Sequence, residues 1–319
     1  MVRAQMSVAI VGAGMAGAAC AAALAARGAG VWLFDKGRSI GGRLAQRRTP
    51  QAVFDHGAQY LSASDPGFQR FLAAALEQGC CASWPGVVSA KGAPVMVGTP
   101  AMASPLKVLL DGLPVALRTV VTALRRTREG WTVGFEDGRA AGPFAAVVLA
   151  IPAPQAAALL GRSGLAAVAP ELDSVRMAPC WAGLASYAQP TGRDGAIRPG
   201  DDDGLVWAAR NDTKPGRGGI ESWTYHAGPG WSQRRLEASP DELAPHFAAL
   251  VSDALGGELA RMTDLTLRRW RYAVVTQPLG QPFRLLADGS LGLCGDWCLG
   301  PRVEAAWLSG QALGRALPW

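Results

Sequence analysis

Uninterrupted apolar runs near the amino end predict the first strands of a parallel sheet. Residues 8–11 (VAIV) and 31–34 (VWLF) are apolar throughout, and the alanine-rich stretch between them ends at Gly28. Strands of a parallel sheet show this pattern because helices cover both of their faces. The order therefore predicts a β-α-β unit whose helix lies between the two runs.

Later apolar runs predict where the chain returns to this sheet. Residues 144–152 are apolar without alternation, and residues 291–296 form another short buried run before an expected helix over 303–317. Both runs are typical of strands covered on two faces. Residues 117–127 and 131–135 instead alternate on either side of a charged turn, which predicts a hairpin.

The stretch between residues 156 and 284 has a different pattern and is rich in Trp, Pro and Gly. Strand-like runs are expected at residues 180–187, 204–209, 220–226 and 266–275. Prolines at 152–154 and 278–282 mark its candidate boundaries. The pattern predicts a second, mainly antiparallel domain between segments of the first sheet.

The turn after the first strand carries the glycine pattern of a dinucleotide-binding loop, GAGMAG over residues 12–17. Gly12 permits a sharp turn, Gly14 permits close approach of a pyrophosphate, and Gly17 lets the helix pack on the sheet. Free N–H groups at the helix N-terminus attract the phosphates. Asp35, at the end of the second strand, is placed to bind a ribose hydroxyl. The residues expected to bind the dinucleotide here are Gly12, Gly14, Met15, Ala16, Gly17 and Asp35.

A second glycine-punctuated loop, KGRSIGGR over residues 36–43, follows that acid. It resembles the second signature of the large flavoprotein group related to glutathione reductase and amine oxidases. In that group the arginine of the GGR sequence, here Arg43, contacts the pyrophosphate, and the arginine fork suits phosphate oxygens. The alternative is a solvated turn, since glycine and arginine are ordinary loop residues. The candidate ligands of this loop are Lys36, Arg38, Gly42 and Arg43.

Composition restricts the class of protein. The chain has 319 residues, 49% hydrophobic and 18% charged, which is enough for two domains or for one large domain with an insertion. The net charge of +6 comes mainly from scattered arginine, so we expect no nucleic-acid partner and an attraction for small anions. No apolar run approaches the roughly 20 residues of a membrane span, and no signal segment is evident. A cytoplasmic protein without a membrane partner is expected.

Cysteine and histidine offer little further chemistry. The six cysteines form no CxxC pair, and His56, His226 and His246 lie far apart in the sequence. These spacings match neither a metal site nor a redox disulfide. Buried free thiols and the absence of a metal are therefore expected.

The order of the predicted strands favours a flavin over nicotinamide alone. A nicotinamide dehydrogenase usually completes its nucleotide domain in one block, whereas here the returning strands lie far downstream, at residues 147–150 and 291–295. Asp296 follows the last strand and is placed to accept from ribityl or ribose hydroxyls. The next helix begins near Arg302 and Val303, whose N–H groups and guanidinium would stabilise negative charge on the reduced ring. Simple solvent exposure of Arg302 is the alternative.

No second GxGxxG follows a strand, so the reductant must meet the flavin directly.

We expect an α/β protein with a discontinuous Rossmann-type FAD-binding domain of the glutathione-reductase/amine-oxidase type. Its second domain is expected to be mainly antiparallel β with helices. The FAD-binding domain would contain residues 1–62, 96–155 and 285–319. The substrate domain would contain residues 63–95 and 156–284.

Several segments taken together resemble the bacterial branch of the renalase family, flavoproteins similar in fold to monoamine oxidases. The likeness spans nearly the whole chain. The matching segments are residues 34–43, 57–60 (GAQY), Val97, Gly98, Pro100, residues 207–211 and 214–217, Arg269, Trp270, Tyr272, Ala273, and residues 294–299, 302–304 and 306–310. Singly most of these are common, and together they are specific.

The resemblance implies a substrate that is a dihydronicotinamide nucleotide reduced at ring position 2 or 6 instead of 4. Hydride passes to flavin N5, the nicotinamide becomes aromatic NAD(P)+, and O2 reoxidises the flavin with release of H2O2. Aromatisation supplies much of the driving force, so positioning matters more than acid–base chemistry. The FAD is expected to be non-covalent, since nothing supports a link through Cys294 or Cys298.

The resemblance also implies the positions of site residues. The further cofactor contacts would be Gly57, Ala58, Gln59, Tyr60, Val121, Gly295, Asp296, Arg302 and Val303. The substrate contacts would be Leu61, Ser62, Gly98, Thr99, Pro100, Cys180 and Asn211. Residues that differ from those usual in the family are His56, Leu61, Cys180, Pro301 and Ala305. These departures bear on substrate preference more than on flavin binding.

Four residues are candidates for the catalytic centre: Arg302, His226, Trp270 and Tyr272. His226 either hydrogen-bonds the substrate or serves only the fold. Trp270 and Tyr272 share one face of a strand, where they either wall the pocket or fill the core. Lys214 and Arg217 either meet substrate phosphates or belong to a surface turn.

Two other functions stay open at this point. The first is an amine oxidase. In monoamine oxidases a lysine near the flavin holds a water by N5, and none of the four lysines here is expected in a comparable buried strand. The second is a flavin-binding sensor without turnover.

Overall fold

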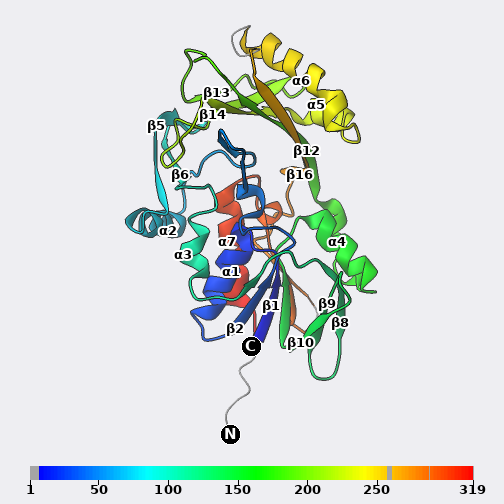
Figure 1. Cartoon of the computed structure of the whole chain (residues 1–319). Helices are drawn as coiled ribbons and strands as arrows, with labels where there is room; N and C mark the ends of the chain where they lie inside the picture. Colours follow the sequence, from blue (N-terminus) through cyan, green and yellow to red (C-terminus); the bar gives the residue numbers. More distant parts are fainter. Residues whose placement is uncertain (1–6, 257–260, 287, 319) are drawn as a thin grey trace.

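The computed structural model describes residues 7–256, 261–286 and 288–318, which form a lower and an upper part (Figure 1). The predictions for residues 1–6, 257–260, 287 and 319 lie outside the described residues. The lower part contains a six-stranded sheet in the order β17-β18-β11-β1-β2-β7. Its strands are β1 (Ser7–Val11), β2 (Gly30–Phe34), β7 (Val115–Ala116), β11 (Ala146–Leu149), β17 (Arg284–Leu286) and β18 (Leu291–Leu293).

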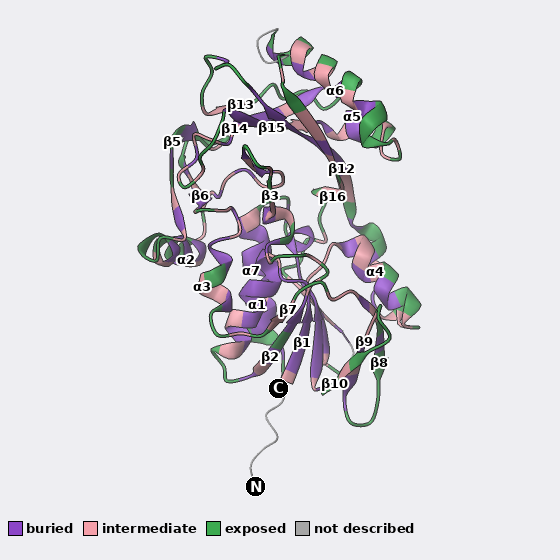
Figure 2. Ribbon diagram, viewed as in Figure 1, coloured by how far each residue is buried: buried purple, intermediate pink, exposed green. Residues whose placement is uncertain are grey.

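Strand β1 shows why this sheet needs uninterrupted apolar runs. Val8 and Ile10 pack into one hydrophobic core, whereas Ala9 and Val11 pack into another on the opposite face. Strand β1 pairs in parallel with β2 and β11, and β11 pairs in parallel with β18. Since both faces are covered, the sheet is buried throughout its centre (Figure 2).

Two layers cover these faces (Figure 1). On one side lie helices α1 (Met15–Ala25), α3 (Leu106–Leu110) and α7 (Val303–Ala316). On the other side lies a three-stranded antiparallel sheet of β8 (Val121–Arg126), β9 (Trp131–Phe135) and β10 (Ala140–Phe144). The sheet therefore lies between helices and a small β layer.

Helices α1 and α7 come from opposite ends of the chain and pack without side chains between them. A Cβ on Gly310 would lie 2.1 Å from the carbonyl oxygen of Ala16, and one on Gly314 would lie 2.7 Å from that of Cys20. Only glycine permits this approach, because any larger residue would overlap backbone atoms. The contact fixes the carboxyl-terminal helix beside the amino-terminal nucleotide loop.

The upper part is a five-stranded sheet in the order β13-β14-β15-β12-β16 with helices on its outer face (Figure 1). Its elements are β12 (Arg176–Ser186), β13 (Ala196–Ile197), β14 (Leu205–Arg210), β15 (Ser222–Ala227), α5 (Pro229–Arg234), α6 (Pro240–Leu255) and β16 (Asp264–Gln277). Every pairing in it is antiparallel. Helix α6 begins with a capping box in which Ser239 and Glu242 satisfy each other's backbone N–H groups.

Shorter elements connect the two parts. They are the hairpin β3 (Gln46–Arg48) and β4 (Val53–Asp55), helix α2 (Pro66–Glu77), the hairpin β5 (Cys81–Val88) and β6 (Pro94–Gly98), and helix α4 (Ala153–Arg162). Four short 3-10 turns complete the described chain: Gly42–Leu44, Ala166–Val168, Pro170–Ser174 and Asp296–Cys298.

The predicted α/β class with a second, antiparallel domain is confirmed. The run at 144–152 forms a strand only over Ala146–Leu149, and the run at 291–296 ends as a strand at Leu293 and turns into a 3-10 helix. The predicted hairpin gains a third strand, β10, which the sequence analysis missed. The exact domain boundaries stay a prediction. Among the described residues, no helix has the length and apolar character that a bilayer crossing requires.

We expect Gly310→Ala to lower the free energy of unfolding by about 1–3 kcal/mol, because the new methyl group forces α1 and α7 apart. The matched control is Gly161→Ala on α4, where a Cβ would meet nothing within 4 Å. That change should leave stability equal or raise it slightly, since alanine favours helix. Urea unfolding compares the two, and equal stabilities would refute the close-packing account.

Candidate active site

A cavity of about 1020 Å³ lies between the lower and upper sheets and is lined by residues from both ends of the chain. Its floor includes the glycine loop and the residues after β2 and β18. Its upper wall comes from strands β12, β14, β15 and β16. Segments far apart in sequence therefore form one chamber.

Most of the predicted cofactor contacts line this cavity. They are Gly12, Gly14, Met15, Ala16, Asp35, Lys36, Gly42, Arg43, Gly57, Ala58, Gln59, Tyr60, Val121, Gly295, Asp296, Arg302 and Val303. Gly17 and Arg38 do not line it. A Cβ on Gly17 would lie 1.9 Å from the carbonyl oxygen of Gly12, so Gly17 permits close packing of the helix on the turn.

Most of the predicted substrate contacts do not line the cavity. Cys180 lines the cavity, whereas Leu61, Ser62, Gly98, Thr99, Pro100 and Asn211 do not. Leu61 is buried, and its backbone pairs with that of Met96. Asn211 is buried too: its amide nitrogen donates to the hydroxyl of Thr224, and its amide oxygen accepts from the N–H of Asp55. The four catalytic candidates, Arg302, His226, Trp270 and Tyr272, all line the cavity.

The glycine loop leaves a set of backbone donors at the cavity floor. Gly12 has a φ of 107°, and a Cβ there would lie 2.5 Å from the carbonyl oxygen of Ala150. Helix α1 begins directly after Gly14, and no side chain caps it. Its first N–H groups are therefore available to an anion, and the helix dipole adds to their attraction.

Asp35 is held rigidly at the end of β2. One carboxylate oxygen accepts from the N–H of Ala13 at 2.7 Å, and the other accepts from the N–H of Gly37 at 2.6 Å. The carboxylate therefore also stabilises the glycine loop, a role that the sequence analysis did not predict. A carboxylate oxygen can accept more than one hydrogen bond, so capacity for a ribose hydroxyl is left.

Arg43 and Asp296 form an ion pair across 253 positions of sequence. Two hydrogen bonds of 2.7 and 2.5 Å join the guanidinium to the carboxylate, and a third, of 3.0 Å, joins it to the carbonyl of Ala273. Both side chains line the cavity. The two residues that were predicted to bind separate parts of the cofactor are thus neighbours, which places the amino-terminal and carboxyl-terminal motifs at one point.

Helix α7 directs its N-terminus toward the same cavity. Arg302 is its N-cap residue, with no side-chain cap, and the half-exposed guanidinium pairs with Glu304 at 3.1 Å. Glu304 is buried and accepts from the N–H groups of Ser64 and Asp65 at 2.5 and 2.6 Å. This glutamate was not predicted, and it ties the helix start to the loop before α2.

The upper wall of the cavity is largely aromatic. Trp270 donates to the carbonyl of His56 at 2.8 Å, and the two rings stack with centroids 5.0 Å apart. Trp207 packs against Tyr60 at a centroid distance of 5.5 Å. Trp207 lines the cavity but was not predicted as a site residue, although it opens one of the matching sequence segments. Flat apolar walls of this kind suit a planar ring system.

His226 in this wall and His56, which stacks on Trp270, are both neutral at physiological pH. Burial lowers the pKa of His226 from 6.5 to about 4. Burial, with the positive charges of Arg268 and Arg47, lowers the pKa of His56 to about 4 as well. Neutral imidazoles can orient a substrate by hydrogen bonding, and they would not transfer protons efficiently near pH 7.

Lys214 corrects one expectation. Its side chain is fully buried, with Nζ 3.1 Å from Asp55, 3.0 Å from Gln59 and over the Trp84 ring at 4.9 Å. Arg217 is buried too and bonds the same Asp55 carboxylate at 2.7 Å. Neither cation is free for a substrate phosphate. The segment does turn at Pro215 and the exposed Gly216, but both cationic side chains point inward. The Pro-Gly pair between Lys214 and Arg217 gave no indication that these two side chains are buried.

Burial lowers the pKa of Lys214 to about 8. Lys214 does not line the cavity, but its hydrogen-bond partner Gln59 does. The Gln59 amide nitrogen also donates to the carbonyl oxygens of Asp55 and Gly57. The lysine therefore fixes the shape of residues 55–59. It is not placed to hold a water against a cofactor ring.

The cysteines are free, and five of the six are buried, with Cys80 partly exposed. Burial raises the pKa of Cys180 and of Cys298 to about 12, so both stay as thiols. Cys294 and Cys298 do not line the cavity. Within the described ranges, no cluster of His, Cys, Asp and Glu has the arrangement of a metal site.

Comparison with known proteins places this architecture in a family. A model described as "NAD(P)-binding Rossmann-like domain" matches residues 10–75, and one described as "Flavin containing amine oxidoreductase" matches residues 80–313. The second match covers well over half of the chain. The protein belongs to the flavin-containing amine oxidoreductase family.

Solved structures with the same fold span almost the entire chain. Cyclohexylamine oxidase from Brevibacterium oxydans IH-35A aligns with a TM-score of 0.68 and 15% identity over 98% of both chains. A putrescine oxidase aligns with a TM-score of 0.67 and 13% identity over 97% of this chain and 98% of that one.

A curated relative matches only locally. The 4,4'-diapophytoene desaturase (4,4'-diaponeurosporene-forming) of Staphylococcus haemolyticus strain JCSC1435 is 42% identical over 60 residues. The match spans 19% of this chain and 12% of that relative. The chain therefore shares one segment with this protein.

The cavity fits the cofactor of the family, and the protein is an FAD-dependent oxidoreductase. The uncapped N-terminus of α1 and the room above Gly14 suit a pyrophosphate, since a Cβ on Gly14 would approach only one atom, at 3.8 Å. Asp35 and Asp296 line the same cavity, where they could accept hydrogen bonds from ribose and ribityl hydroxyls. The uncapped start of α7 lies at the far end of that floor.

We expect the folded protein to lose stability as the pH falls from about 6.5 to about 4. In this window the unfolded chain binds protons at His226 and His56 that the folded chain does not bind, so the free energy of unfolding rises with pH. His226→Gln should flatten the dependence by on the order of 2 kcal/mol. His246→Gln, at an exposed position on α6, is the control. Equal slopes for both variants in urea unfolding at pH 4–7 would contradict the burial argument.

Proposed function

We propose that the protein is an FAD-dependent oxidase of dihydronicotinamide nucleotides reduced at ring position 2 or 6. The observation that supports this most is the charge of the cavity. Six basic residues line it: Lys36, Arg43, Arg162, Arg269, Arg271 and Arg302. In the described chain only two acids line it, Asp35 and Asp296, and both are engaged, one with backbone N–H groups and the other with Arg43.

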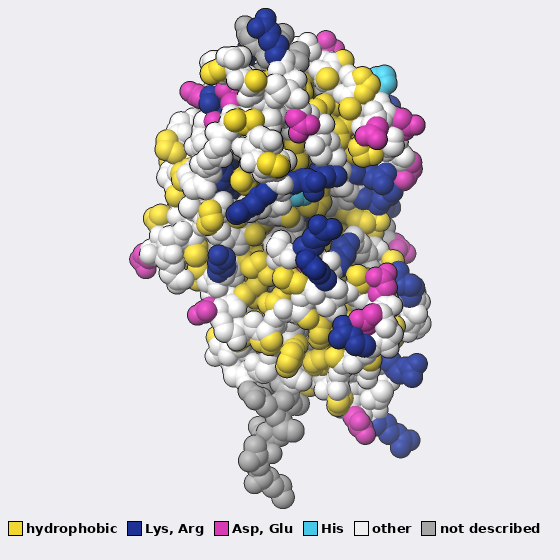
Figure 3. Space-filling view, viewed as in Figure 1, with side chains coloured by type: hydrophobic (Ala, Val, Ile, Leu, Met, Phe, Trp, Pro, Cys, Tyr) yellow, Lys and Arg dark blue, Asp and Glu magenta, His cyan; other side chains and the backbone are white. Residues whose placement is uncertain are grey.

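This balance favours an anionic substrate over a cationic one. An ammonium group entering the cavity would find no uncommitted carboxylate among the lining residues. Four of the six lining cations are ion-paired as well: Arg43, Arg269, Arg271 and Arg302. A phosphate would therefore be attracted by Lys36, by Arg162 and by the excess of lining cations over lining acids. Figure 3 shows the same bias from outside, with Lys and Arg side chains gathered across the middle of this face and Asp and Glu nearer its edges.

The aromatic wall supports a planar substrate ring. Trp270, Tyr272, Trp207 and Tyr60 all border the cavity, and His226 lies between them as a neutral hydrogen-bonding group. These residues would exclude water and orient the ring, which is the main requirement for a hydride donor that becomes aromatic. No residue of the wall would need to remove a proton from carbon.

FAD supplies the redox chemistry when bound: it would accept one hydride, which carries two electrons, from the substrate and would pass those two electrons to O2. With two protons, one from the reduced flavin and one from solvent, O2 becomes H2O2. The residues of the chain act around this exchange. Asp35 and the N–H groups of α1 would hold the dinucleotide end, and the N-terminus of α7 with Arg302 would stabilise negative charge at the ring.

An amine oxidase is the second candidate. The family description and the two oxidases above favour it, because both of those proteins are named for amine substrates. Against it stand the engaged carboxylates and the position of Lys214, which is bonded to Asp55 and Gln59 and does not line the cavity.

Anaerobic mixing of the holoprotein with candidate reductants separates the two. We expect rapid bleaching of the flavin by 2- or 6-dihydronicotinamide nucleotides, slow or no bleaching by the ordinary 4-dihydro isomer, and none by cyclohexylamine or putrescine. Admission of O2 should then return the colour with one H2O2 per turnover. Bleaching by the amines instead would establish the second candidate, and no bleaching by any of these reductants would leave a flavin-binding protein without this activity.

A further inference from the structure

Two neighbouring arginines near the cavity, neither of which lines it, stand without a counter-charge in the described part of the chain. Arg47 lies on β3 and Arg268 lies on β16, and neither guanidinium group makes a hydrogen bond or an ion pair with a described residue. By contrast, Arg269 and Arg271 on the same strand both pair with Glu237. The missing counter-charge therefore distinguishes this pair from the arginines beside it.

The strand register places Arg268 on the cavity side of the upper sheet. In this sheet Arg268 is opposite Ala182, Ala182 is opposite His226, and His226 is opposite Trp207. Directly opposed residues of antiparallel strands point to the same face. Since His226 and Trp207 line the cavity, Arg268 lies on that same face, two positions from Trp270.

The β3–β4 hairpin brings Arg47 to the same place. Arg47 is opposite Phe54, and the alternation of strand side chains places His56 on their face as well. Phe54 packs against Leu184 of the upper sheet, which fixes this face of the hairpin on the sheet. His56 accepts the hydrogen bond of Trp270 through its carbonyl, so hairpin and β16 are in direct contact.

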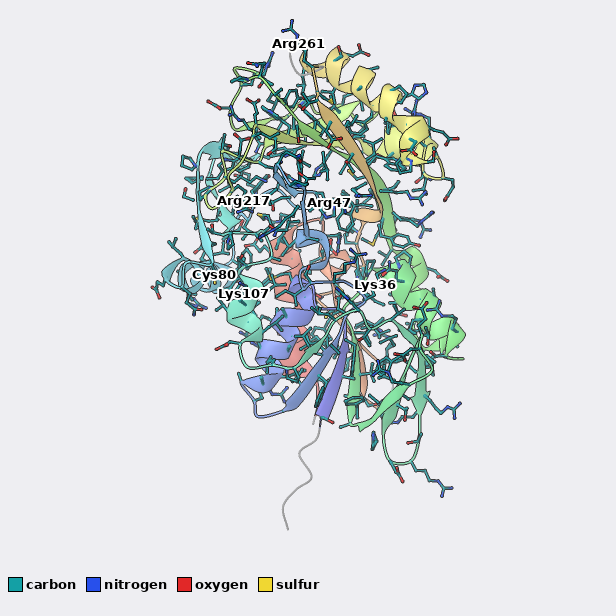
Figure 4. All side chains as sticks on the ribbon, viewed as in Figure 1. Lys36, Arg47, Cys80, Lys107, Arg217 and Arg261 are labelled. Atoms are coloured by element: carbon teal, nitrogen blue, oxygen red, sulfur yellow. The ribbon has the colours of Figure 1, made fainter. Side chains whose placement is uncertain are left out.

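The positive charges of Arg47 and Arg268 affect the pKa values of nearby groups. The pKa of Arg268 is lowered by burial and by the charge of Arg47, and both arginines lower the pKa of His56. Arg268 is half-buried and Arg47 is exposed, and two guanidinium groups that repel each other cost free energy in the absence of an anion. Figure 4 shows Arg47 between the lower and upper parts of the molecule, above Lys36.

We propose that Arg47 and Arg268 form a phosphate-binding site at the cavity edge, which holds a phosphate of the substrate while its ring lies against the aromatic wall. The proposal rests on the proposed function, and it names the residues that make the oxidase prefer a nucleotide over the bare nucleoside. Two guanidinium forks present paired N–H donors that match phosphate oxygens. A bound phosphate would also remove the repulsion between them.

The chain offers a close control. Arg48 is next to Arg47 on β3 but points to the opposite face of the hairpin, the face that it shares with Gln46. Arg47→Gln, Arg268→Gln and Arg48→Gln each remove one positive charge. Only the first two remove a donor from the proposed site.

The test compares three substrates with the same dihydro ring: the riboside, the mononucleotide and the dinucleotide. For the phosphate-bearing substrates, kcat/KM should fall at least tenfold in Arg47→Gln and Arg268→Gln and should change less than twofold in Arg48→Gln. The riboside should react equally well with all four proteins, which shows that the variants are folded. Rates that fall together for riboside and nucleotides, or that fall for neither, overturn the proposal.

A binding measurement makes the test independent of turnover. Calorimetric titration of the holoprotein with inorganic pyrophosphate should give at least tenfold weaker binding in Arg47→Gln and Arg268→Gln than in the wild type and Arg48→Gln. Equal binding by all four proteins, or none by the wild type, overturns the site. If no dihydronicotinamide is oxidised, the proposed function fails, and the pyrophosphate titration alone still decides the arginine site.

Discussion

The close packing of α1 against α7 is the contact on which the cofactor site depends. It places the start of the chain beside its end, because Gly310 and Gly314 let two helix backbones approach without side chains between them. The uncapped N-termini of both helices border the cavity, α1 at Met15 and α7 at Val303. The ion pair of Arg43 with Asp296 then joins the loops beyond them.

A second set of contacts holds the upper part over this floor. Asp55 binds both Lys214 and Arg217 in a fully buried cluster, and Lys214 also fixes the amide of Gln59. Removing one member of such a cluster would leave a buried charge without its partner, which is costly. The segment 55–60 is thereby fixed between the two sheets, with its backbone along the cavity. Its geometry is set by charges that never touch the ligand.

Residues in a specific sequence motif could be assigned to the cavity from the sequence, whereas contacts between distant segments could not. Most of the glycine loop, Asp35 and Asp296 were predicted as cofactor contacts, and in the structure they line the cavity. A glycine-rich turn between a buried strand and a helix is the signal that pointed to them. Their hydrogen bonds to the loop and to Arg43 were not predictable, since they depend on contacts between distant segments. The assignment of Leu61 and Asn211 to the substrate rested only on the resemblance, and the structure buries both away from the cavity.

The burial of the cations Lys214 and Arg217 could not be predicted from their own segment. A lysine and an arginine around a Pro-Gly pair are usually exposed, so their composition favoured a surface turn. Burial followed instead from Asp55, 159 positions before Lys214, which no local pattern could connect to them. The role of Trp207 was missed for a similar reason, because its place in the wall depends on strand pairing and not on its own segment.

The FAD content of the purified chain tests the central claim, that motifs from both ends form one cofactor site. Visible absorbance and released flavin should give one FAD per wild-type chain. Gly12→Ala at one end and Asp296→Asn at the other should each reduce that content, although they lie far apart in sequence. A wild-type protein that is colourless and takes up no added FAD, or variants that both retain full content, would contradict the account.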